Sequence, residues 1–254
     1  MDLRQVLENV IDIARGAGSA VLAVYATNFE VQNKADSSPV TDADKQAEER
    51  IVAALAALTP DIPVVSEEAS AVGPIPSIGA RFWLVDPLDG TKEFVSRNGE
   101  FTVNIALVED RDPTLGVVLA PALGRLFGGA RGVGAFTEEA GRRRAIACRR
   151  APTEGLTVVS SRSHGDREAL NAFLAGRQIA SAAFTGSSLK FCLIASGEAD
   201  LYPRLGRTME WDTAAGHAVL AAAGGRVTQL DGTDLRYGKP QFANPHFVAM
   251  GPVA

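Results

Sequence analysis

The spacing of apolar residues changes near Pro152, and this change limits the folds that the chain can adopt. Between Val64 and Arg150, short β-rich segments are separated by turn residues, and such short connections favour antiparallel neighbours. After Pro152, strand-like segments alternate with helical ones as far as Met250. That alternation is typical of a mainly parallel or mixed sheet covered on both faces. The sequence therefore predicts two halves that contain different sheets.

Helical periodicity precedes both sheets. Apolar residues recur at helical spacing from Leu3 to Val24, and Thr41 can cap a second helix that Pro60 stops. Six strands are expected before Pro152, at residues 64–65, 82–85, 101–108, 115–120, 125–129 and 144–148. After it we expect strands at 156–160, 182–184, 200–202, 226–229 and 247–250, and helices at 167–174, 187–196 and 212–223.

Charge and composition exclude several classes of function. The net charge of −5 and the lack of a basic stripe disfavour nucleic acid as a partner. The arginines of residues 142–144 are instead interpreted as an exposed strand edge. No apolar run reaches the ~20 residues that span a bilayer, and the start lacks the pattern of a signal peptide. We expect a cytoplasmic monomer or homodimer without disulfides, with peripheral attachment to the inner face of the cell membrane left open.

The segment WLVDPLDGTKEF at residues 83–94 is the most informative for function. An apolar strand delivers Asp86, Pro87 enforces a turn, and Asp89 follows three residues later. Two carboxylates and the carbonyl of Leu88 can then face one cation, and hard oxygen ligands suit Mg²⁺. Asp and Gly are also ordinary turn formers, so the segment alone leaves a plain turn open.

Two further carboxylates favour a metal site. Glu67 follows the strand at 64–65, where a short connection can place it beside Asp86. Asp212 opens the helix at 212–223, either as an acid that the helix dipole favours or as a ligand aimed into the cleft between the halves. Asp44 follows Thr41 by three residues, so this pair can be a simple capping box.

Four stretches together resemble the inositol monophosphatase superfamily, and within it the bacterial 3′(2′),5′-bisphosphate nucleotidases. They are DPLDGTKEF at 86–94, GSSLKFC at 186–192, ADLYPR at 199–204 and TMEWDTAAGH at 208–217. The resemblance covers nearly the whole chain. It implies a layered αβαβα sandwich of class α+β or α/β. An antiparallel sheet with two helices would form a metal-binding domain at 1–151, and a smaller mixed sheet a substrate-binding domain at 152–254.

The resemblance also implies a role for each site residue. Two or three Mg²⁺ ions would be held by Glu67, Asp86, Asp89, Asp212 and the Leu88 carbonyl. Asp44, Thr91 and Glu67 would be catalytic, with Asp44 and Thr91 acting on the attacking water. The substrate-binding residues would be Gly90, Thr91, Ser161, His164, Gly186, Lys190, Arg204 and Asp212. From the residues alone, an exposed loop histidine is an equally good interpretation of His164.

The implied activity is removal of the 3′-phosphate from adenosine 3′,5′-bisphosphate and 3′-phosphoadenylyl sulfate, by in-line attack of water, in sulfur metabolism. Inhibition by Li⁺ is implied as well. Alternatives are an inositol-1-phosphatase or broad sugar phosphatase, and a non-catalytic nucleotide-binding regulator. One departure is Arg207, which stands where relatives often have proline. Arg207 either loosens the turn before Asp212 or adds a phosphate contact.

Overall fold

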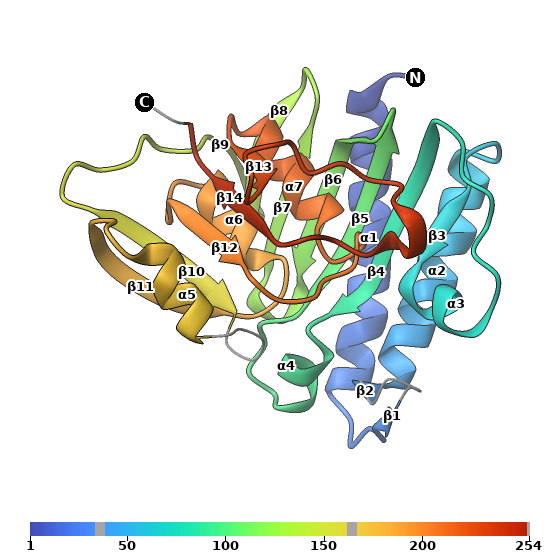
Figure 1. The fold of residues 1–254 in the computed structure, drawn as a ribbon. Coiled ribbons are helices and arrows are strands. Elements are labelled where there is room, and N and C mark those ends of the chain that lie inside the picture. Colours follow the sequence, from blue (N-terminus) through green and yellow to red (C-terminus); the bar gives the residue numbers. More distant parts are fainter. Residues whose placement is uncertain (34–38, 162–166, 253–254) are drawn as a thin grey trace.

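The structure is a computed structural model that describes residues 1–33, 39–161 and 167–252. Its elements form five layers, helices alternating with two sheets (Figure 1). Helices α1 (Leu3–Tyr25) and α2 (Asp42–Leu58) cover the outer face of the larger sheet. Helices α6 (Leu189–Ala195) and α7 (Ala214–Ala222) lie between the sheets, and α5 (Arg167–Leu174) packs on the smaller sheet from outside. The predicted αβαβα sandwich is confirmed.

The larger sheet has seven strands that are neighbours in chain order. They are β3 (Val64–Ser66), β4 (Arg81–Asp89), β5 (Thr102–Glu109), β6 (Asp112–Ala120), β7 (Arg125–Ala130), β8 (Gly134–Glu139) and β9 (Arg142–Ile146). All neighbours are antiparallel except β3 and β4, which are parallel. The prediction of antiparallel pairing is therefore wrong for this pair. The connection that contains α3 (Glu67–Val72) is long enough to bring the chain back to the same end of the sheet.

The smaller sheet is mixed, as the alternating pattern predicted. Its strand order is β11-β10-β12-β14-β13, with β10 (Leu156–Ser161), β11 (Ile179–Thr185), β12 (Leu201–Arg204), β13 (Arg226–Gln229) and β14 (Phe247–Met250). Strand β10 is parallel to β11 and β12, whereas β14 is antiparallel to β12 and β13. The remaining pieces are short: β1 (Gln32–Asn33), β2 (Pro39–Val40), α4 (Thr91–Val95) and two 3₁₀ turns, Pro121–Leu123 and Pro240–Phe242.

The layers follow from the alternation of side chains along the strands. In β4, Trp83 and Val85 pack against α1 and α2, while Phe82 and Leu84 face α6 and α7. The inner core continues from the larger sheet through α7 to strand residues of the smaller sheet such as Phe247. One hydrophobic core therefore joins both sheets.

The outermost strand of the larger sheet has the charged edge that the sequence predicted. Within the described residues, strand β9 pairs only with β8, and its residues Arg142 to Ala145 are exposed. Arg143 pairs with Glu138 of β8 and with Glu8 of α1. Strand β8 was not predicted, because glycine and two glutamates make its sequence read as a turn. Charge at this edge opposes pairing with another sheet.

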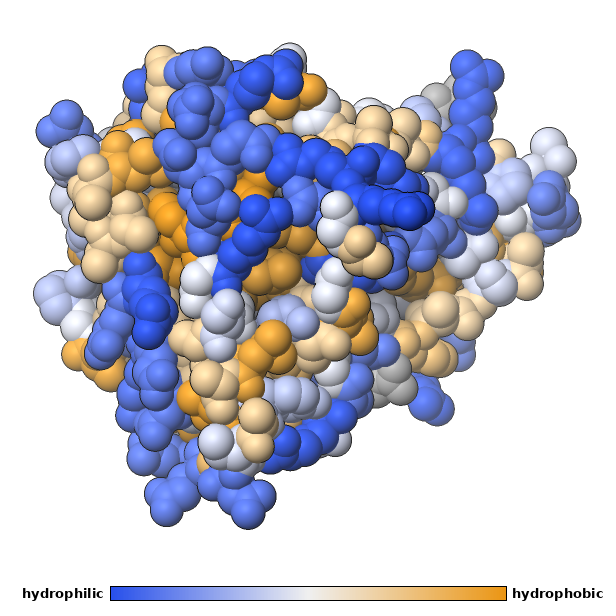
Figure 2. All heavy atoms as spheres, turned by 180° about the vertical axis from the view of Figure 1, so that it is seen from behind, coloured by the Kyte–Doolittle hydropathy of each residue, from blue (hydrophilic) through white to orange (hydrophobic). Residues whose placement is uncertain are grey.

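The surface shows mixed polarity. On the face behind the view of Figure 1, hydrophilic side chains cross the apolar areas and break them up (Figure 2). Within the described ranges, no helix combines the length and apolar character that spanning a bilayer requires. Both cysteines, Cys148 and Cys192, are free thiols.

Candidate metal and substrate site

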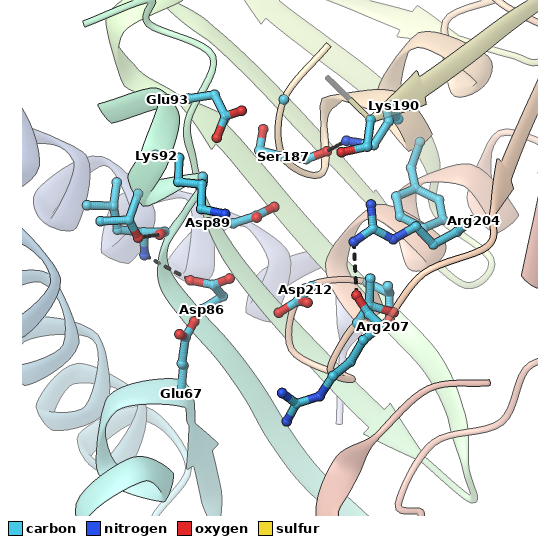
Figure 3. A pocket seen from close by; sticks show the side chains of 18 of the residues that line it. Glu67, Asp86, Asp89, Lys92, Glu93, Ser187, Lys190, Arg204, Arg207 and Asp212 are labelled. Carbon is cyan, nitrogen blue, oxygen red and sulfur yellow. Dashed lines mark hydrogen bonds between the residues drawn. The ribbon is translucent and has the colours of Figure 1, made fainter. Parts of the chain in front are cut away.

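A pocket of about 390 Å³ opens where β4 ends, and both halves of the chain line it. Carboxylates of the first half, Glu67, Asp86 and Asp89, lie on one wall. Lys190 and Arg204 lie on the opposite wall, and Asp212 points into the space between (Figure 3). The pocket thus has an acidic side and a basic side.

The register of two parallel strands explains why Glu67 and Asp86 meet. Ser66 pairs with Val85, so the next residue of each strand emerges at the same end of the sheet. Asp212 arrives from the turn before α7, where the Met209 amide donates a hydrogen bond of 2.9 Å to its carboxylate. Carboxylate oxygens of these three residues lie within 4.8 Å of one another.

The chemistry of this carboxylate cluster fits a metal cation. Burial, then repulsion by Asp89 and Glu67, raises the pKa of Asp212 well above its usual value. Burial likewise raises the pKa of Asp89. Several buried negative charges at short range are costly without a positive counter-charge. A close group of ligands in which every donor atom is an oxygen suits a hard divalent ion. The cluster could therefore hold a metal.

Asp89 borders the cluster without joining the group of three. The strand register shifts between Asp86 and Asp89, and the Leu88 amide donates 3.0 Å to the Asp86 carboxylate inside this irregular stretch. Asn104 of β5 donates 3.3 Å to Asp89 and 3.0 Å to the Ser188 hydroxyl.

Asn104 is a site residue that the sequence interpretation missed. Ser188, which accepts its second hydrogen bond, donates 2.6 Å to the Asp212 carbonyl, so a polar chain connects Asp89 to the turn of Asp212. Asn104 is fully buried in a strand that is otherwise mostly apolar. The sequence did carry a signal for Asn104, namely a side-chain amide at a core position of a strand. Buried polar groups usually have hydrogen-bond partners, so such an amide indicates a polar contact.

Asp44 takes part in a capping box and also faces Thr91. One carboxylate oxygen of Asp44 accepts hydrogen bonds from the Thr41 amide (2.7 Å) and the Thr41 hydroxyl (2.8 Å). Its other oxygen lies 3.5 Å from the Thr91 hydroxyl, which also lies 3.3 Å from the Leu88 carbonyl. Only 1 % of Asp44 is exposed. The two interpretations of Asp44 therefore use different oxygens and are compatible.

Gly186, in the loop before α6, lines the pocket as a residue expected to bind substrate. Its amide donates 2.9 Å to the Glu100 carboxylate. A Cβ atom at this position would lie 2.6 Å from the Glu100 carbonyl oxygen and 2.7 Å from the Cγ atom of Glu93. Gly186 is therefore required because the two halves of the chain approach closely here.

Lys190 lines the pocket, but its ammonium group is largely engaged by the protein. The Nζ atom donates 2.6 Å to the Ser187 carbonyl and 3.2 Å to the Thr185 carbonyl. The side chain is buried, and burial lowers its pKa to about 8 against the opposing effect of Asp89. Lys190 thus shapes the loop at 185–188, where Ser187 has a positive φ of 49°.

Three other predicted substrate residues also line the pocket. Ser161 ends β10, Gly90 precedes α4 with a φ of 91°, and both line the pocket. Arg204 ends β12 and donates 2.9 Å to the Arg207 carbonyl. His164 lies outside the described residues.

The layered fold and the carboxylate cluster define a family of proteins. The family model "Inositol monophosphatase family" matches residues 2–250, and the chain belongs to this family. The resemblance recognised in the sequence motifs is confirmed.

Within the family, the chain is similar to proteins named 3′(2′),5′-bisphosphate nucleotidase CysQ. It is 50% identical over 244 residues to the protein from Escherichia coli O157:H7, covering 95% of this chain and 98% of the relative. The protein of that name from Buchnera aphidicola is 41% identical, covering 97% and 94%. The crystal structure of CysQ from Bacteroides thetaiotaomicron has a TM-score of 0.82 and 36% identity, and 98% of each chain is covered.

Proposed function

We propose that the protein is a Mg²⁺-dependent phosphomonoesterase that hydrolyses the 3′-phosphate of adenosine 3′,5′-bisphosphate and of 3′-phosphoadenylyl sulfate. The observation that carries this proposal is the carboxylate cluster of Glu67, Asp86 and Asp212 beside a wall that bears cations. Similarity to proteins named as bisphosphate nucleotidases supplies the substrate class.

Five groups would hold two or three Mg²⁺ ions, namely the carboxylates of Glu67, Asp86, Asp89 and Asp212 and the carbonyl of Leu88. When bound, Mg²⁺ supplies Lewis-acid stabilisation of the charge that develops on the phosphate oxygens. The protein's own contribution is to fix these oxygens at the end of β4 and before α7, where the hydrogen bonds to Asp86 and Asp212 hold them.

Asp44 and Thr91 would manage the proton of the attacking water. The Thr91 hydroxyl lies between the Asp44 carboxylate and the pocket, so it can accept the water's proton while it passes its own to Asp44. The water oxygen forms a bond to phosphorus as the bond from phosphorus to the 3′-oxygen breaks, and the 3′-oxygen leaves with that electron pair and takes a proton from solvent water. The backbone N–H groups of Gly90 and Thr91 would bind the phosphate that is transferred.

The second half would bind the nucleoside. Ser161, Gly186, Lys190 and Arg204 surround the pocket opposite the acidic wall. Gly186 and Lys190 act mainly by fixing the loop that faces Asp89, since their donors bond to Glu100 and to backbone carbonyls. Arg204 brings a buried positive charge to the same wall. His164 remains a prediction.

One panel of substrates tests the proposal against its alternatives. Phosphate release is measured from adenosine 3′,5′-bisphosphate, inositol-1-phosphate, fructose-1,6-bisphosphate and AMP, with Mg²⁺ and with EDTA. We expect kcat/KM to be highest for the adenosine bisphosphate and activity to vanish in EDTA. Preference for inositol-1-phosphate would favour the polyol or sugar phosphatase. Tight nucleotide binding without phosphate release would favour the regulator.

Inhibition by lithium is a second test of the same site. We expect Li⁺ at sub-millimolar to millimolar concentrations to inhibit turnover at constant ionic strength, because Li⁺ is close to Mg²⁺ in size, unlike Na⁺, and can replace it among these carboxylates without supplying its second charge. The measurement is initial rate against Li⁺ concentration, with Na⁺ at equal concentration as the control. Equal rates in Li⁺ and Na⁺ at tens of millimolar would count against the proposed metal site.

A further inference from the structure

Among the residues that the structure describes, four cationic side chains line the pocket, and Arg207 differs from the other three. The others are Lys92 on α4, Lys190 and Arg204. Lys190 and Arg204 are buried, and both donate to backbone carbonyls. Arg207 is exposed, and within the described part of the chain the one hydrogen bond found for its guanidinium is a 3.8 Å contact to the Met209 sulfur. Sulfur is a weak acceptor. Most donors of this guanidinium are therefore available to a ligand.

The backbone that bears Arg207 is held in place from both sides. Arg204 donates 2.9 Å to the Arg207 carbonyl, and the Asn244 amide donates 2.9 Å to the Thr208 carbonyl. Two residues after Arg207, the Met209 amide bonds to Asp212. The residue therefore lies on the same short turn as a proposed metal ligand. In Figure 3 its side chain extends past Asp212 toward the side of the pocket where Glu67 lies.

A bisphosphorylated nucleotide needs a cation of this kind. The reacting phosphate meets the carboxylates and their metal ions, but the second phosphate keeps its charge and is not transferred. A guanidinium presents two parallel N–H groups that match phosphate oxygens, and it is always protonated. Arg207 combines these properties with an exposed position on the pocket rim.

We propose that Arg207 binds the non-reacting 5′-phosphate group of the substrate, and so adds a contact that strengthens the preference of this chain for a bisphosphate over a monophosphate. This inference rests on the function proposed above. Arg204 is then a positioning residue, because its bond to the Arg207 carbonyl fixes the turn from which the guanidinium extends.

The test compares two substrates that share the reacting phosphate. Adenosine 3′,5′-bisphosphate has the 5′-phosphate and 3′-AMP lacks it. For Arg207→Gln we expect KM for the bisphosphate to rise about tenfold while kcat and the KM for 3′-AMP stay within about twofold. Arg207→Lys should recover part of the loss. The control is Arg131→Gln, which removes an equal charge from an exposed arginine outside the pocket lining.

Direct binding of 5′-AMP gives a readout that does not depend on catalysis. By titration calorimetry, Arg207→Gln should weaken its Kd about tenfold, as expected for loss of one charge-assisted contact. Equal loss on both substrates, or unchanged 5′-AMP binding, would overturn the inference and leave Arg207 as a turn residue or a solvated side chain. If wild-type protein releases no phosphate from the bisphosphate, the proposed function itself fails, and the 5′-AMP titration still decides the role of Arg207.

Discussion

Asp44 divides its carboxylate between two partners. One oxygen serves Thr41 at the start of α2, and the other faces the Thr91 hydroxyl. A helix cap contributes stability and a general base contributes rate, so the two roles are separable by measurement.

Replacing Asp44 and Thr41 in separate variants tests whether the two roles are divided in this way. Asp44→Asn should lower kcat by about a hundredfold or more, because an amide accepts no proton. Thr41→Ala removes the capping hydroxyl and should cost about 1 kcal/mol of unfolding free energy while kcat changes little. Steady-state kinetics and urea unfolding of both variants give the comparison. A kcat that falls equally in both would show that Asp44 acts only through the helix.

At this scale the sequence predicted the carboxylates well and their supporting contacts poorly. Glu67, Asp86 and Asp212 lie close together, as the strand ends and the family resemblance predicted, and their role as metal ligands stays a prediction. The partners of Lys190 could not be predicted. They are carbonyls of a loop whose path depends on Ser187 adopting a positive φ, and a serine gives no sign of that conformation.

Among the elements, α7 owes its position to its close approach to the larger sheet. A Cβ atom on Gly116 of β6 would lie 2.3 Å from the Ala215 carbonyl oxygen and 2.8 Å from the Ala218 Cβ atom. Alanine and glycine on both sides allow the helix to lie this close, directly after the turn that bears Asp212.

We therefore expect Gly116→Ala to destabilise the protein by at least about 2 kcal/mol, since backbone must move to admit the methyl group. The matched control is Gly16→Ala in α1, where nothing lies within 4 Å of the added atom. That change should stabilise by about 0.5–1 kcal/mol through helix propensity. Urea unfolding of both variants is the measurement. Equal effects would contradict the packing of α7 on β6.

His217 makes α7 sensitive to acid. Its ring is buried, with Nδ1 3.1 Å from the Tyr237 hydroxyl. Burial, with Arg236 and Lys239 adding to it, lowers the His217 pKa to about 3. The unfolded histidine binds a proton near pH 6.5, so folding stability is full above that pH and falls as the pH decreases toward 3.

The expected loss is on the order of 4–5 kcal/mol between pH 6.5 and pH 3, of which about 2–3 kcal/mol falls above pH 4.5, and His217→Gln should remove most of it. Unfolding free energies at pH 7.5 and pH 4.5 give the difference for each protein. The exposed-site control is Arg131→Gln, which leaves the acid-sensitive loss unchanged. If His217→Gln loses as much stability as wild type between these pH values, other groups control the acid response.

Periodicity placed most elements, including α5, β13 and β14 with the observed bounds. It missed α3 and α4, because each begins within a motif that also reads as a turn. Helix α7 begins two residues later than expected, at Ala214, and leaves Asp212 on a turn. These differences arise from tertiary contacts, such as the bond between Met209 and Asp212, that local pattern does not contain.

At the scale of the whole molecule, the carboxylate cluster joins the two halves of the chain. Glu67 and Asp86 belong to the first half and Asp212 to the second. A cation among them attracts groups that repel one another in its absence. Metal binding should therefore stabilise the fold as a unit.

Mg²⁺ at about a hundred times its Kd should add about 2.7 kcal/mol to the unfolding free energy. Asp212→Asn should lose most of this gain, and without metal it should melt above wild type because a repelling charge is gone. The control is Asp61→Asn at an exposed position. Thermal melts with Mg²⁺ and with EDTA provide the data. An undiminished Mg²⁺ effect in Asp212→Asn would remove this residue from the metal site.

The layer order followed from the change in pattern near Pro152 and from the family resemblance. The chain leaves the larger sheet at Ile146 and enters the smaller one at Leu156, on either side of the predicted boundary at 151/152. Independent folding of 1–151 and 152–254 stays a prediction. The periodicity of apolar residues did not show that α6 and α7 pack against both sheets, because periodicity does not specify which elements a helix contacts.

The shared middle layer has a consequence for synthesis. A ribosome that has delivered residues 1–146 has released every strand of the larger sheet, with α1 and α2 ready to cover one face. The opposite face, with Phe82, Leu84 and Phe127, waits for helices that begin only at Leu189 and Ala214. At ~5–20 residues per second this interval lasts several seconds. During that time the nascent chain exposes an apolar sheet, which is a natural substrate for a chaperone.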